Sequence, residues 1–207
     1  EPAFKGLYGF PGSVCVSVNE EVVHGIPSDG RVLQDGDIVS IDVGVRLDGW
    51  CSDSAWTFRV GEVGAEADAL MEVTERSLDA AIEVAVVGNH VGDIGAAVMK
   101  TVDGTTYGII RDLVGHGVGR EVHEEPQVPN VGRPGHGPLL REGMVLAIEP
   151  MLSAATPKIR TLDDGWTVVT ADKSLSAHFE HTVAITGQGP RVLTLAREAA
   201  DAVSRGA

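Results

Sequence analysis

DIVSIDVGVRLDGWCSDSAWTFR, residues 37–59, has the pattern of a β-hairpin, with two strand-like runs on either side of the turn residues Asp48 and Gly49. In the first run, the two-residue period of a strand places Asp42 on the face opposite the aliphatic positions 39, 41, 43 and 45. A loop of residues 46–49 would set Asp42 directly opposite Asp53. A two-residue loop would make the pair diagonal on the same face, and a three-residue loop would separate the two side chains.

Two carboxylates that share one face of a hairpin repel each other, because cross-strand neighbours are only about 4.5–5.5 Å apart at Cβ. Asp42 and Asp53 therefore call for a metal ion or a shared proton. The alternative is a pair of solvated acids on an exposed sheet face, and the hairpin alone favours neither interpretation.

After the hairpin, residues 62–87 carry apolar side chains at the three-and-four spacing of an amphipathic helix, which Gly88 ends. A second helix is predicted from Asp93 to about Val102. Strands are predicted at residues 13–18, 144–151 and 177–185, and residues 126–138, rich in proline, predict a long loop. These elements favour an α+β fold in which the helices cover a sheet.

The later strands carry two further acids among apolar neighbours, Glu149 and Glu180. A buried carboxylate persists only if it is paired, protonated or bound to metal. His116 lies between two glycines, where the missing side chains leave room for a close approach.

Four acids and one histidine form a ligand set for two divalent cations. Two ions about 3.5–4 Å apart can bridge a hydroxide and polarise a carbonyl, which is hydrolytic chemistry on an amide or an ester. The spacing does not distinguish a peptide from a phosphoester substrate. A zinc protease of the HExxH type is excluded, because His116 and His123 are too far apart in sequence.

The length and composition of the chain limit which kinds of protein it can be. A chain of 207 residues with 43% hydrophobic content predicts one domain or a closely joined pair of halves. The net charge of -14 and the lack of a Lys/Arg-rich run argue against a nucleic-acid partner. Two cysteines outside any CxxC pattern suit a reducing compartment. With no signal peptide or apolar run near the ~20 residues of a membrane span, we expect a cytoplasmic protein without a membrane partner.

Several segments together resemble the type I methionine aminopeptidases: VNEEVVHGIP, IDVG, CSDSA, GHGVGREVHEEPQV, GMVLAIEPM and DGWTVVTADKSLSAHFEHTV. They follow the order of that family and cover nearly the whole chain. The resemblance implies the pita-bread fold, a pseudo-twofold antiparallel sheet covered by helices, as a single catalytic domain over residues 1–207. It also implies removal of the initiator methionine from nascent polypeptides when the second residue is small.

Position by position, the resemblance implies metal ligands at Asp42, Asp53, His116, Glu149 and Glu180. Asp53 and Glu180 would bridge two divalent ions, of cobalt, manganese, iron or zinc. His116 and Glu149 would complete one site and Asp42 the other. A hydroxide held between the ions would attack the scissile carbonyl.

The resemblance also implies catalytic and substrate-binding residues. His123 would contact the scissile amide and His24 would stabilise the intermediate or the departing amine. Glu149 would shuttle the proton. The methionine pocket would be lined by Phe10, Cys15, His24 and Trp166, whose aromatic rings and thiol suit a polarisable side chain.

The chain departs from that family in two ways. It starts where several tens of residues of helix and strand would normally precede it, so an N-terminally short form is expected. Leu7 and Val122 stand where aromatic residues are common. The alternatives are an Xaa-Pro dipeptidase of the same fold and a non-catalytic binding protein on the same scaffold. The expected enzyme is a monomer that meets its peptide substrate in the cytoplasm, at the ribosome.

Overall fold

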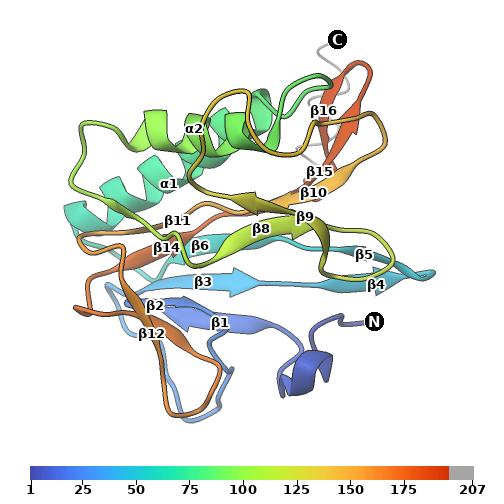
Figure 1. Cartoon of the computed structure of the whole chain (residues 1–207). Coiled ribbons are helices and arrows are strands. Elements are labelled where there is room, and N and C mark those ends of the chain that lie inside the picture. The colour runs from blue at the N-terminus through green and yellow to red at the C-terminus, as the bar shows by residue number, and fades with distance from the viewer. Residues whose placement is uncertain (196–207) are drawn as a thin grey trace.

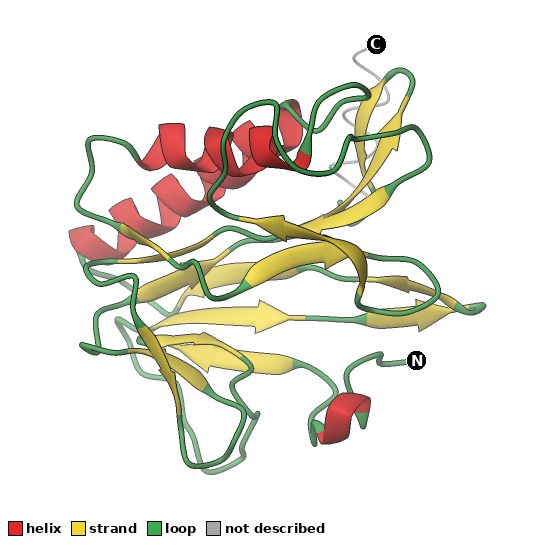
Figure 2. Cartoon of the chain, in the orientation of Figure 1, coloured by secondary structure: helices red, strands yellow, loops and turns green. Residues whose placement is uncertain are grey.

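A computed structural model describes residues 1–195, and residues 196–207 of the expected single domain lie outside the described part. Within that part, two α-helices lie side by side against a set of strands (Figure 1). Figure 2 shows the strands on one side of this pair of helices. All the strand pairs found there are antiparallel. The arrangement confirms the expected α+β class, with helices covering antiparallel strands.

The helices are α1, Ala65–Glu83, and α2, Val91–Val102, and a short 3₁₀ turn, η1, covers Leu7–Gly9. In chain order, the strands are β1 Cys15–Val18, β2 Glu21–Val23, β3 Ile38–Asp42, β4 Val45–Leu47, β5 Trp50–Ser52, β6 Ala55–Arg59, β7 Gly108–Ile109, β8 Val114–Gly117, β9 Glu124–Pro129, β10 Val145–Ile148, β11 Met151–Ser153, β12 Ile159–Thr161, β13 Val168–Thr170, β14 Ser176–His178, β15 His181–Thr186 and β16 Gly189–Val192.

The hairpin of residues 37–59 has the two-residue loop of Asp48 and Gly49. Both loop residues have positive φ, 51° and 77°, which matches the twist of the flanking strands. Asp42 pairs with Ala55, so Asp53 lies diagonal to Asp42 and not opposite it. Of the registers that the sequence left open, the diagonal one is therefore observed.

The aliphatic face predicted for the first strand of the hairpin is only partly buried. Val45 is 40% exposed, whereas Ile38, which alternation places on the face of Asp42, is 1% exposed. The reason is that β3 is covered on both sides at its start, where Ile38 packs in the core under the helices. Alternation alone could not show this two-sided cover.

Two runs predicted as single strands are interrupted. Glu149 and Pro150 separate β10 from β11, and Phe179 and Glu180 separate β14 from β15. Proline has no N–H to offer a strand ladder, which explains the first break. Asp53 lies in the similar gap between β5 and β6. As a result, the strands form several short sheets, with the orders β16-β15-β10-β8-β9, β1-β3-β6, β14-β11-β7, β12-β13-β2 and β4-β5.

Several boundaries differ from the prediction, and α1 ends at Glu83, before the expected Gly88. The second helix begins at Val91, before Asp93, because the Asp93 carboxylate accepts the His90 N–H at 2.7 Å and caps the first turn. The loop predicted at 126–138 begins later, since Glu124–Pro129 forms β9 against β8.

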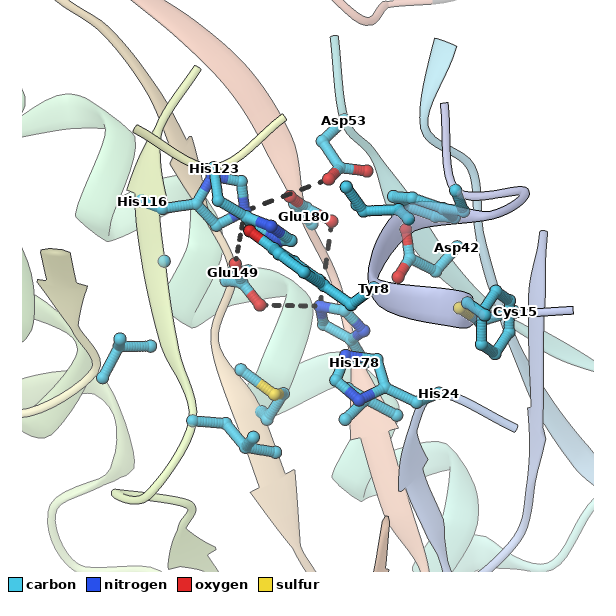
Figure 3. A pocket seen from close by; sticks show the side chains of 18 of the residues that line it. Tyr8, Cys15, His24, Asp42, Asp53, His116, His123, Glu149, His178 and Glu180 are labelled. Carbon is cyan, nitrogen blue, oxygen red and sulfur yellow. Dashed lines mark ion pairs between the residues drawn. The ribbon is translucent and has the colours of Figure 1, made fainter. Parts of the chain in front are cut away.

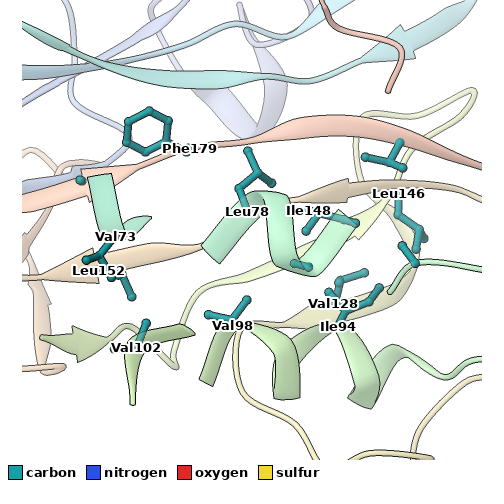
Figure 4. Packing of buried hydrophobic residues seen from close by; sticks show 14 of the residues in the cluster. Val73, Leu78, Ile94, Val98, Val102, Val128, Leu146, Ile148, Leu152 and Phe179 are labelled. Carbon is teal, nitrogen blue, oxygen red and sulfur yellow. The ribbon is translucent and has the colours of Figure 1, made fainter. Parts of the chain in front are cut away.

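The main core lies between the helices and the strands beneath them (Figure 4). The apolar stripes of both helices contribute to it, and strands β10 and β11 supply the facing layer. Members labelled in the figure are Val73, Leu78, Ile94, Val98, Val102, Val128, Leu146, Ile148, Leu152 and Phe179. Neither helix of residues 1–195 is long and apolar enough to cross a membrane.

A smaller cluster holds the N-terminal segment in place. Phe4 and Phe10 are buried against Cys15 and Val122. The ring of Phe4 lies against Gly44, where an added Cβ would come within 2.5 Å of it. The aromatic N-terminal segment therefore packs on the body of the fold.

Candidate active site

Every residue that the sequence singled out for the site lines one cavity of about 520 Å³. Figure 3 shows acidic and imidazole side chains at one end of it and Cys15 at another side. The predicted residues in the lining are Phe10, Cys15, His24, Asp42, Asp53, His116, His123, Glu149, Trp166 and Glu180.

The two most buried acids, Asp53 and Glu180, come from gaps between strands and are held there by backbone hydrogen bonds. The Asp53 N–H donates to the Thr182 hydroxyl at 2.8 Å, and this hydroxyl donates to the Asp53 carbonyl at 2.7 Å. The Glu180 N–H donates to the Ala55 carbonyl at 2.8 Å. These bonds tie the segment between β5 and β6 to the start of β15, and both carboxylates line the same cavity.

His116 on β8 completes a cluster with them. Its Nε2 lies 3.4 Å from Glu149 Oε1 and 3.9 Å from Asp53 Oδ2. On the other side of the ring, Nδ1 lies 3.0 Å from the Gly117 carbonyl. A carbonyl only accepts, so Nδ1 carries the proton and Nε2 offers its lone pair to the cavity, as in a metal-binding histidine.

The glycines beside His116 are required by close backbone packing. A Cβ on Gly115 would lie 2.3 Å from the Ala147 carbonyl oxygen, and one on Gly117 would lie 2.3 Å from the Glu125 carbonyl oxygen. Strand β8 is thus squeezed between β10 and β9, which fixes the position of the imidazole.

Burial dominates the electrostatics of the cluster. It raises the pKa of Asp42, Glu149 and Glu180 well above the ordinary value, and neighbouring carboxylates, Asp53 among them, add to the effect. Burial also raises the pKa of Asp53 to about 7 and lowers that of His116 to about 4. The protein therefore gathers carboxylates that lack a compensating charge around a neutral imidazole.

The donor set fits a divalent cation. One ligand atom from each of Asp53, His116 and Glu180 lies within 4.8 Å of the others. Asp42 Oδ1 and Glu180 Oε1 are buried and lack a hydrogen-bond partner within the described chain. Oxygen-rich sites with one imidazole suit first-row divalent ions, and a cation would satisfy the orphaned oxygens.

Two further histidines, His24 and His123, line the cavity beside the cluster. The ring of His123 meets that of His116 edge to face, with centroids 4.5 Å apart. His24 follows β2 with a positive φ of 59°. Burial lowers the pKa of both rings, and for His24 the nearby His123 adds to the effect. Both are therefore neutral near pH 7, able to donate one hydrogen bond and accept another.

The other predicted lining residues form an apolar pocket. Phe10 and Trp166 pack edge to face with ring centroids 5.2 Å apart. Cys15 is 4% exposed beside them, and burial, followed by the charge of Asp42, raises the pKa of its thiol, so the thiol stays neutral. Leu7 also lines the cavity. An unbranched apolar side chain would find aromatic and sulfur contacts here.

Sequence reasoning did not assign several residues that line this cavity, among them His178 and Tyr8. His178 is 2% exposed, with Nε2 3.7 Å from Glu149 Oε2 and 3.9 Å from Glu180 Oε2. It stands on the same face as Glu180 in the predicted strand, and this alternation was a usable signal. Tyr8 stacks on His123 at the mouth, with centroids 5.9 Å apart, and nothing in its local sequence indicated that position.

Comparisons with known proteins agree with this geometry. The sequence profile of metallopeptidase family M24 matches residues 4–187. The methionine aminopeptidase of Clostridium perfringens is 56% identical over 194 residues, which cover 94% of this chain and 78% of that protein. The crystal structure of methionine aminopeptidase from Thermotoga maritima superposes with a TM-score of 0.93 at 49% identity, covering 95% of this chain and 79% of that chain.

A more distant structure defines the wider fold. The prolidase from Pyrococcus horikoshii has a TM-score of 0.71 at 27% identity and matches 89% of this chain but only 48% of its own length. The expected pita-bread fold is confirmed by these neighbours, and the dipeptidase alternative is not favoured. The family and the ligand set together support dependence on a divalent metal. The chain belongs to metallopeptidase family M24 and, within it, to the methionine aminopeptidases.

Proposed function

We propose that this chain removes the N-terminal methionine of new polypeptides by metal-dependent hydrolysis when the second residue is small. One observation carries the proposal: a cavity of about 520 Å³ joins a cluster of buried acids and an imidazole to a pocket built from Phe10, Cys15 and Trp166. The cluster supplies hydrolytic groups, and the pocket beside it supplies a place for one apolar side chain. The names of the similar proteins support the same activity.

Five side chains would hold two divalent ions. Asp53 and Glu180 would be shared between the ions, His116 and Glu149 would complete one site, and Asp42 the other. When bound, such ions lower the pKa of water and polarise a carbonyl oxygen. The orphaned oxygens of Asp42 and Glu180 support this assignment, because a cation would satisfy both. Cobalt, manganese, iron and zinc all suit the set.

The remaining polar side chains would handle the substrate. The neutral ring of His123, beside His116, is able to donate a hydrogen bond to the scissile amide. His24, which also lines the cavity, would stabilise the tetrahedral intermediate or the departing amine. Glu149, whose pKa is raised by burial and by Asp53, would take a proton from the attacking water and pass it to the leaving nitrogen.

Substrate selection would come from both ends of the scissile bond. Phe10, Cys15 and Trp166 would receive the methionine side chain through aromatic and sulfur contacts. Crowding just past the scissile bond would restrict the second residue to a small one. The physiological substrate would be the N-terminal peptide of a nascent chain, met as a monomer in the cytoplasm and at the ribosome.

The test is turnover on metal-stripped protein to which manganese or cobalt is added back, with Met-Ala-Ser and Ala-Pro as parallel substrates. The expected result is release of free methionine from Met-Ala-Ser only when metal is present. Cleavage of Ala-Pro alone would identify an Xaa-Pro dipeptidase instead. No cleavage of either substrate by protein that binds no metal would leave the non-catalytic binding role standing.

A further inference from the structure

His178 ends β14 with its backbone held on two sides. Its N–H donates to the Thr57 hydroxyl at 2.9 Å, while this hydroxyl donates to the His178 carbonyl at 2.8 Å. Across the other edge, His178 pairs with Met151 of β11. The side chain is 2% exposed, so it is packed on all sides.

The imidazole of His178 points at the candidate ligands (Figure 3). Its Nε2 stands 3.7 Å from Glu149 Oε2 and 3.9 Å from Glu180 Oε2, beyond hydrogen-bond length for either. Among the side chains of residues 1–195, this nitrogen is one of three buried polar atoms that lack a partner, and the other two belong to Asp42 and Glu180. A buried polar atom without a partner is rare in folded proteins and calls for an explanation.

His178 is better suited to donate a hydrogen bond than to bind the cation itself. Its Nε2 faces carboxylate oxygens of Glu149 and Glu180, which accept hydrogen bonds when ionised, so this nitrogen serves best as a donor. Small rotations of either carboxylate would bring an oxygen within reach.

We propose that His178 is a positioning residue whose Nε2–H donates to the Glu149 and Glu180 carboxylates and fixes their orientation for the metal. The role rests on the proposed function of these two glutamates. Outer hydrogen-bond donors of this kind orient metal ligands and typically change metal affinity by roughly 10–100-fold when removed. Since Glu149 would also shuttle the proton, loss of the donor would misplace the acid/base group as well as weaken metal binding.

The test compares His178→Gln with His178→Leu. Glutamine keeps an N–H donor at a similar reach, whereas leucine fills the space without a donor. Manganese affinity, measured by calorimetry on metal-stripped protein, should fall roughly 10–100-fold in His178→Leu and stay close to the wild-type value in His178→Gln. The visible spectrum of the cobalt-loaded protein should change in the leucine variant alone, and kcat should fall more than KM changes.

His181→Leu is the matched control. His181 is a partly buried neighbour on the same segment, but it bonds to the Thr194 hydroxyl at 2.8 Å and packs on Trp56, away from the cavity. It should leave manganese affinity unchanged, which separates loss of the donor from a general disturbance of the segment that joins β14 to β15. Unfolding curves of all three variants show whether each is folded before its affinity is interpreted.

Three results would overturn the proposal. Wild-type manganese affinity in folded His178→Leu would show that the donor is not needed. Equal loss in His178→Gln and His178→Leu would show that the imidazole itself is required, as a ligand or as a base. An equal loss of manganese affinity in His181→Leu would assign the effect to a general disturbance of the segment that holds both histidines. Wild-type protein that binds manganese without releasing methionine would refute the proposed function alone, because the affinity comparison still tests His178.

Discussion

The substitution Asp53→Asn should stabilise the metal-free protein at alkaline pH while abolishing its response to metal. Asp53 is 4% exposed, and burial raises its pKa from the ordinary 3.8 to about 7. Because each pKa unit corresponds to about 1.4 kcal/mol, ionising this side chain costs the metal-free fold about 4 kcal/mol by pH 8. The amide of the Asp53→Asn variant would carry no charge and would still accept the Ser54 N–H, which now donates to Asp53 Oδ1 at 3.0 Å.

The direction of this pH dependence follows from the number of protons that Asp53 binds in the folded and unfolded states. Well below pH 4, Asp53 is protonated in both the folded and unfolded states, so wild-type protein and Asp53→Asn should have similar stability. Between about pH 4 and pH 7, the folded wild type holds a proton that the unfolded chain has released, so its free energy of unfolding falls as pH rises. Above pH 7 the full difference is reached, and the melting temperature of Asp53→Asn should exceed that of wild type by on the order of 10 °C.

The assay is thermal unfolding by circular dichroism in a chelator at pH 4.5, 6 and 8, repeated with added manganese. Manganese should raise the melting temperature of wild type but not that of Asp53→Asn. Asp48→Asn, which removes a charge from the exposed hairpin turn, is the control and should behave like wild type throughout. An Asp53→Asn protein less stable than wild type at pH 8 in chelator, or a difference independent of pH, would refute the reasoning.

Three further predictions concern the same cavity. Manganese affinity should increase from pH 5 to pH 8, since raised carboxylate pKa values mean that the ligands must release protons to bind; calorimetry showing a flat profile would contradict this. His123→Ala should keep its metal, as measured by elemental analysis, but lower kcat by roughly 100-fold or more because a hydrogen bond to the reacting amide is lost; a metal-free variant would argue for a ligand role. Trp166→Ala should raise KM for methionyl peptides roughly tenfold or more without changing manganese affinity, because it removes one wall of the apolar pocket; an unchanged KM would remove Trp166 from that pocket.

The acids could be found from the sequence because each contradicts its surroundings. Glu149 and Glu180 interrupt apolar runs, and Asp42 shares one face of a hairpin with the like charge of Asp53, so each indicates a partner that local sequence does not supply. The glycines around His116 identified it in the same way, and the structure shows the two carbonyl contacts that require them. Conflict between a residue and its local pattern was the informative signal.

Other features depend on contacts that local patterns do not contain. Continuous strands were predicted through Glu149 and Glu180, yet both residues lie in gaps, because periodicity records which face a side chain takes and not where pairing stops. Ile38 is buried because it belongs to the core cluster that includes residues of α1, which comes later in the chain. Tyr8 reaches His123 only through the packed N-terminal segment.

A metal ion bound at the gaps between strands would also make the chain's lifetime depend on metal supply. Asp53 and Thr182 are 129 positions apart, and the hydrogen bonds between them join the early hairpin to the last long strand beside the acids. A cation bound by Asp53, His116 and Glu180 would join three segments that are distant in sequence, as a cross-link does. At a hundred times its dissociation constant, such an ion adds about 2.7 kcal/mol to the stability of the folded form. A cell starved of metal would therefore hold this protein in a form that opens more often and is degraded sooner, so abundance as well as activity would follow the metal.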